Sequence, residues 1–199
     1  MWELRLEVPE QNGIISTRYF ERISMIDITT KQLWSALTPA EKEDACLAFW
    51  EGADTFSRDA QPKVLQELAA ALRFREAFLK RVKPLEKARH LRRLMDTPTL
   101  RHLCDDVFRS WLVSRKAAML VCFVEAQGMP HVGGIIEDSV TSPDAETLRK
   151  GVRAVRDKFP ARDVALYMGV MLAAGGDFWV GLADAIEAEI PDFLKSLGT

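Results

Sequence analysis

The stretch TPTLRHLCDDVFRSWLVSRKAAMLVCFVEAQ, residues 97–127, decides the fold class of this 199-residue chain. It opens on Thr97-Pro98, a capping residue followed by a proline that suits a first helical turn because proline lacks an N–H. Apolar side chains then recur around the whole circumference of a helix. The pattern predicts one central helix over 98–127, about 45 Å long at 1.5 Å per residue.

Helix signals of the same kind stand on both sides of this stretch. Thr38-Pro39 with Glu41 forms a capping box, and Ser142-Pro143 repeats the pairing of a cap with a proline. The segments predicted as helices are 16–27, 30–37, 39–52, 59–82, 84–95, 98–127, 143–159, 161–174 and 177–190, with a last turn after Pro191. The sequence therefore predicts a mainly α protein, an irregular multi-helix bundle of about eight helices with a short extended N-terminal arm.

The arm is residues 2–8, in which apolar and charged side chains alternate as in a half-buried strand until Pro9 ends the pattern. A lone strand leaves its backbone donors and acceptors unpaired. It could pair with residues 14–19, lie on its own helices, or cross to a second copy of the chain. We favour the last arrangement and expect a homodimer.

Residues 128–141 form the clearest break between helical segments, because Gly128 suits the end of a helix and Gly133-Gly134 permits unusual backbone angles. We expect a single helical domain over 1–199. The connector is the candidate boundary between two subdomains, 1–127 and 142–199.

Composition restricts the classes of function. The chain carries 27 Lys+Arg against 29 Asp+Glu and lacks an apolar run of the length needed to cross a membrane. The first residues lack the basic start and apolar run of a secretory signal. Its three cysteines form no CxxC pair, which argues against a disulfide framework and a zinc finger. We expect a cytoplasmic protein with no membrane association, no metal site and no cofactor.

The motifs typical of nucleotide-binding proteins, metalloproteases and serine hydrolases are absent. The first interpretation is therefore a non-enzymatic interaction or regulatory module whose protein partner the sequence does not identify. The alternative is a small-molecule-binding protein or enzyme with its site between the subdomains. The candidate ligand-binding residues of this alternative, all in the connector, are His131, Gly133, Gly134, Glu137 and Asp138.

A second alternative is binding of an anion or nucleic acid through the basic segment 73–116, which has 13 Lys+Arg and 5 Asp+Glu. Each flanking segment has 7 Lys+Arg and 12 Asp+Glu. The candidate partner-binding or anion-binding residues are Lys87, Arg89, Arg92 and Arg93.

The simpler interpretation of the basic segment is that its cations pair with acidic helices of the same chain. The spacing of Arg101, Asp105 and Arg109 also predicts a ladder of ion pairs along one helix. The aromatic residues of the segment follow the apolar stripes, so they are not expected to stack on bases. The residues concerned are Phe74, Phe78, Phe108 and Trp111. The sequence thus argues against nucleic-acid binding.

Overall fold

The computed structural model describes residues 26, 28–52, 55–97, 102–137 and 139–197, which form eleven α-helices and one two-stranded hairpin. The helices are α1 (Thr30–Ala36), α2 (Pro39–Glu51), α3 (Thr55–Leu72), α4 (Glu76–Arg81), α5 (Pro84–Met95), α6 (Cys104–Arg115), α7 (Ala117–Ala126), α8 (Ala145–Lys158), α9 (Ala161–Ala174), α10 (Leu182–Glu189) and α11 (Phe193–Leu197). The strands are β1 (His131–Val132) and β2 (Ile135–Ile136). The mainly α fold is confirmed, while the arm predicted at 2–8 lies outside the described residues.

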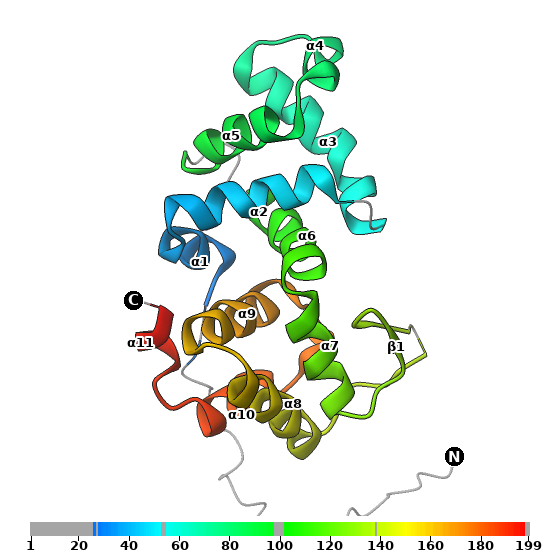
Figure 1. Cartoon of the computed structure of the whole chain (residues 1–199), viewed down its shortest axis with the longest axis vertical. Coiled ribbons are helices and arrows are strands. Elements are labelled where there is room, and N and C mark those ends of the chain that lie inside the picture. Colours follow the sequence, from blue (N-terminus) through cyan, green and yellow to red (C-terminus); the bar gives the residue numbers. More distant parts are fainter. Residues whose placement is uncertain (1–25, 27, 53–54, 98–101, 138, 198–199) are drawn as a thin grey trace, which may run out of the picture.

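The helices form two groups joined by α6 (Figure 1). Helices α2 to α5 lie in the upper part of the view, and α7 to α10 lie in the lower part. Helix α6 packs against α2 and α3 of the upper group and against α9 of the lower group. One hydrophobic core runs through both groups. The division into subdomains 1–127 and 142–199 stays a prediction.

The capping box predicted at the start of α2 is confirmed. The Thr38 hydroxyl accepts a hydrogen bond from the N–H of Glu41 at 3.3 Å, and the Glu41 carboxylate accepts one from the N–H of Thr38 at 2.7 Å. Arg162 of α9 donates to the same carboxylate at 2.9 Å and helps to hold the pKa of Glu41 below its usual value, although burial opposes this shift. The cap therefore also ties α2 to the second group of helices.

The single helix predicted over 98–127 is wrong, because α6 and α7 meet at a break at Lys116. The N–H of Lys116 bonds to the carbonyls of Trp111 at 3.3 Å and Leu112 at 3.1 Å, and the bond across five residues is a π-type turn. The Lys116 ammonium reaches Asp163 of α9 at 2.8 Å. A contact between helices thus holds the bend where the sequence has neither glycine nor proline.

The helix predicted over 59–82 is also wrong, since α3 ends before Arg73 and α4 begins after it. Arg73 has a φ of 56°, and the N–H of Phe74 bonds back to the carbonyl of Ala69 at 2.9 Å. Glycine usually occupies such a left-handed end of a helix. An arginine there gives no local signal, so the sequence pattern missed the turn.

Two smaller corrections concern the C-terminal third. Helix α8 is capped by Asp144, whose carboxylate accepts from the N–H of Thr147 at 2.7 Å, rather than by Ser142. The helix predicted over 177–190 divides into a 3₁₀ turn, η2 (Asp177–Trp179), and α10. Gly181, with a φ of 84°, separates them.

Candidate functional site

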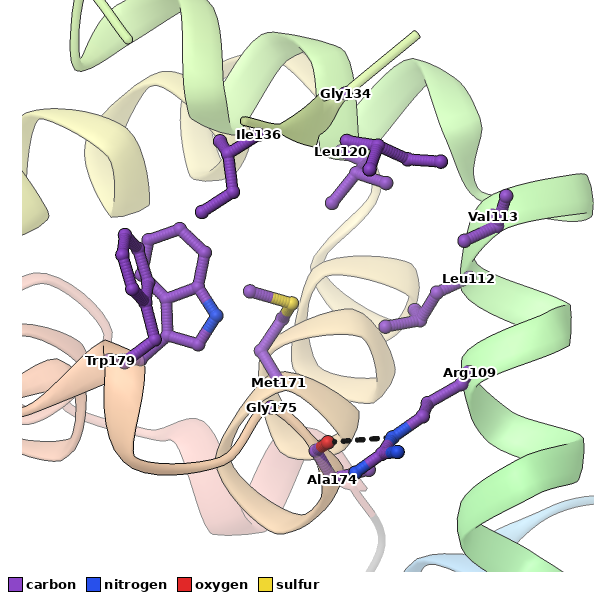
Figure 2. Close-up of a pocket in the computed structure, with 12 residues that line it drawn as sticks. Arg109, Leu112, Val113, Leu120, Gly134, Ile136, Met171, Ala174, Gly175 and Trp179 are labelled. Atoms are coloured by element: carbon purple, nitrogen blue, oxygen red, sulfur yellow. Dashed lines mark hydrogen bonds between the residues drawn. The ribbon is translucent and has the colours of Figure 1, made fainter. Parts of the chain in front are cut away.

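A pocket of about 270 Å³ opens between α6, α7, the hairpin and the C-terminal end of α9 (Figure 2). Four separate segments of the chain form its walls. Its lining residues are Arg109, Leu112, Val113, Leu120, Gly134, Ile135, Ile136, Met171, Ala174, Gly175, Phe178 and Trp179. Apart from Arg109, every lining residue is a glycine or has an apolar side chain, and the indole nitrogen of Trp179 is the one polar atom in those side chains. The pocket is therefore suited to an apolar occupant.

Two glycines set the shape of the walls. Gly134 has a φ of 88°, and a Cβ at this position would lie 2.6 Å from Cγ of Leu120. A Cβ on Gly175 would collide with the carbonyl oxygen of Met171 and lie 2.8 Å from Cδ1 of Trp179. The hairpin and η2 can approach the helices this closely only because both positions lack a side chain.

Arg109 stands at one end of the pocket and Trp179 at the other (Figure 2). The Arg109 Nε donates a hydrogen bond to the carbonyl oxygen of Ala174 at 3.1 Å, which satisfies an acceptor at the last turn of α9. The expected ladder between Asp105 and Arg109 is wrong, since no ion pair within 4 Å joins them among the described residues. The guanidinium instead crosses from α6 to α9.

Of the connector residues predicted to bind a ligand, Gly134 lines the pocket. The ring Nδ1 of His131 accepts a hydrogen bond from the N–H of Gly134 at 3.0 Å, so this histidine supports the hairpin turn. Gly133 and Glu137 are exposed and do not line the pocket, and Asp138 lies outside the described residues. The connector thus contributes one wall.

The four predicted anion-binding residues lie on α5, but α2 already pairs with two of them. Glu43 accepts from Arg89 at 3.2 Å and lies 3.6 Å from Arg92. Lys87 lies over the ring of Trp50 at 5.1 Å, and burial lowers the pKa of this lysine. Arg93 is exposed, and no contact with another described charge is found for it. Pairing within the chain thus accounts for Arg89 and Arg92.

The aromatic residues of the basic segment divide into two kinds. Phe108 and Trp111 are buried as expected, whereas Phe74 is 43% exposed and Phe78 is 56% exposed. The two exposed rings lie edge to face, 5.3 Å apart, where α3 meets α4. The prediction that all four follow buried stripes is wrong for this pair, because the turn at Arg73 redirects the chain.

A cluster of charges that the sequence pattern does not predict surrounds Glu189. Glu189, the last residue of α10, is 6% exposed and meets three arginines of α8. Its carboxylate accepts from Arg149 at 3.1 Å, from Arg153 at 2.8 Å and from Arg156 at 3.1 Å. The hydrogen bond from Arg153 is the largest influence that lowers the pKa of Glu189 to about 2. Only the fold brings these segments together.

Within the described ranges, no group of three or more His, Cys, Asp or Glu side chains is arranged to hold a metal ion. None of the described helices is both long and apolar enough to cross a lipid bilayer.

Comparison with known proteins gives no assignment, because no family model, curated protein or solved structure matches the chain.

Proposed function

We propose that this protein is a non-enzymatic binding protein that takes a small apolar molecule into the pocket lined by Gly134. The observation that carries the proposal is the pocket itself, about 270 Å³ of space with apolar walls from four segments. Its described lining contains no histidine, cysteine, serine or carboxylate that could act as a nucleophile or base. The arrangement supports binding over catalysis.

The volume sets the size of the ligand. An apolar cavity of about 150 Å³ holds one benzene, which corresponds to about 25 Å³ for each carbon. The pocket therefore accommodates about eleven non-hydrogen atoms, the size of a bicyclic aromatic or an eight-carbon to ten-carbon chain. Burial of eight methylene-sized groups contributes about 6 kcal/mol, which corresponds to a Kd of tens of micromolar.

Titration with 1-naphthylamine, a bicyclic fluorophore that is neutral at pH 7 and whose emission shifts to shorter wavelength in apolar sites, tests the proposal. We expect saturable binding by the wild type. Val113→Trp fills the pocket from its half-buried wall on α6 and is expected to abolish the signal. Leu85→Trp is the matched control, since Leu85 is exposed on α5 at the other end of the molecule. Equal dye binding by both variants would contradict the proposal.

A second candidate function, a protein interaction module, is favoured by the exposed Phe74–Phe78 pair. Arg73, Arg75 and Arg81 flank it and are exposed, and no ion pair of theirs is found within the described part of the chain. Charge complementarity indicates an acidic partner segment with apolar residues. The rings lie 75° apart, so they do not present parallel faces to successive bases, which favours a protein over a nucleic acid.

Fluorescence anisotropy with a labelled peptide of alternating Glu and Leu tests this second candidate. We expect weak binding at low salt that is lost in Phe78→Ser. Leu194→Ser, a control at an exposed leucine of α11, is expected to keep it. Tighter binding of an oligouridine than of the peptide would replace the protein partner by a nucleic acid. Absence of binding to both would remove the candidate.

The cytoplasm is the proposed location. The three cysteines form no disulfide, which supports a reducing compartment, and two of them, Cys46 and Cys104, are fully buried and interact electrostatically with each other. Burial raises the pKa of the Cys46 thiol, which keeps it protonated and unreactive at neutral pH.

A further inference from the structure

Arg109 is the one ionisable side chain in the described lining of the pocket. Its Nε already donates to the carbonyl oxygen of Ala174, which fixes the plane of the guanidinium. Among the described residues, no hydrogen bond or ion pair is found for its two terminal amino groups. A fixed guanidinium whose two terminal amino groups bond to no other described residue can bind a carboxylate through two parallel hydrogen bonds.

The surroundings do not neutralise this charge by contact. Arg109 also lines a second hollow, of about 300 Å³, together with Asp59, Ala60, Lys63 and Asp106. Neither acid forms an ion pair with Arg109 within 4 Å.

We infer that the ligand is an amphipathic anion: an apolar body of about eight to ten carbons that ends in a carboxylate at Arg109. This inference rests on the proposed function and names the class of molecule that the same pocket takes. The apolar body would extend from Arg109 past Met171 towards Trp179 and Ile136 (Figure 2). The carboxylate would stay partly hydrated, because Arg109 is exposed.

The orientation follows from the distribution of polar groups in the walls. The end at Trp179 and Ile136 offers only the indole N–H, which faces the space in Figure 2. A charged group there would lose its hydration without a counter-ion, which is costly. The end at Arg109 offers a cation and access to water, so the charged end of the ligand belongs there.

Displacement of bound 1-naphthylamine at neutral pH by octanoate, octanol and octylammonium tests the inference. Octanoate is expected to bind about tenfold more tightly than octanol, as an exposed charge-assisted pair allows, and octylammonium the least tightly. In Arg109→Gln, octanoate and octanol are expected to bind with about equal affinity, and octanol is still expected to displace the dye. Arg93→Gln, at an exposed arginine of α5, is the matched control and is expected to keep the tenfold preference.

The outcomes separate the two proposals. Equal affinity for octanoate and octanol in the wild type would overturn the anionic ligand and leave the apolar pocket standing. A preference for octanoate that survives in Arg109→Gln would overturn the role of Arg109. Failure of the dye and of octanol to bind the wild type would overturn the proposed function itself.

Discussion

Substitution of Glu189 by glutamine should destabilise the protein by removing the one negative charge at the centre of three arginines. Glu189→Gln keeps the size of the side chain but removes the carboxylate that Arg149, Arg153 and Arg156 share, while Arg156 keeps its pair with Asp157. Arg156 would still donate to the backbone carbonyl of residue 189 at 2.9 Å, so α8 and α10 would stay in contact. The loss of stability therefore measures the effect of the missing charge and not the loss of the contact between α8 and α10.

The magnitude follows from the pKa of Glu189, which falls from 4.5 to about 2 on folding. At about 1.4 kcal/mol for each pKa unit, this shift corresponds to about 3 kcal/mol of stability at pH 7. The arginine side chains are 39–44% exposed, so solvent screening reduces this value, and we expect a loss of about 2 kcal/mol. The midpoint of thermal unfolding should fall by about 4–8 °C.

The sign of the pH dependence follows from the direction of the shift. Because folding lowers the pKa of Glu189, its stabilisation is complete above the pKa of the unfolded chain and is lost as the pH falls towards about 2. The difference in unfolding free energy between wild type and Glu189→Gln should thus shrink by about 1 kcal/mol between about pH 7 and pH 3.5.

Urea unfolding at several pH values measures this difference, with Asp157→Asn as the matched control. Asp157 also pairs with Arg156, at 2.8 Å, but it is 59% exposed, and removal of this carboxylate should cost less than about 0.5 kcal/mol. A loss below about 0.5 kcal/mol in Glu189→Gln, or a loss that stays constant over the pH range, would refute the reasoning.

Two further predictions concern the hairpin and the N-terminus. Gly134→Ala should lower the unfolding free energy by about 1–3 kcal/mol and weaken dye binding, because the new Cβ would clash with Leu120 and the residue would keep a φ of 88°. Gly133→Ala is the control: its φ is 61° and nothing lies within 4 Å of the new Cβ, so it should lower the unfolding free energy by about 1 kcal/mol and leave dye binding intact. Sedimentation should show a dimer for the full chain and a monomer for a version that lacks residues 1–10, and a monomer in both cases would end the homodimer prediction.

Local signals in the sequence were sufficient for much of the fold. The segments predicted at 84–95 and 161–174 coincide with α5 and α9, because proline precedes or opens each helix and an apolar pattern runs through it. The breaks at Arg73 and Lys116 carry no such signal. A left-handed arginine and a π-type turn are held by contacts with the rest of the structure, which periodicity within one segment does not contain.

Less of the candidate site than of the fold could be predicted from the sequence. Gly134 was predicted, because a pair of glycines in a connector is a local signal. Met171 and Trp179 were not, since each belongs to a segment predicted as helix for its own apolar pattern. A pocket made by four segments exists only after they pack, and no single segment contains its outline.

Arg109 illustrates the physical reason. Its helical spacing from Asp105 predicts an ion pair, but such a pair on an exposed helix contributes only about 0.2–0.5 kcal/mol. A hydrogen bond from a charged donor to an otherwise unsatisfied carbonyl contributes about 1.5–3 kcal/mol, and the carbonyl of Ala174 lies 3.1 Å from Nε. The contact between helices therefore prevails over the contact within the helix. The same contact holds the guanidinium at one end of the pocket. The residue that most constrains the proposed ligand class is therefore one whose local sequence pattern indicates a purely structural role.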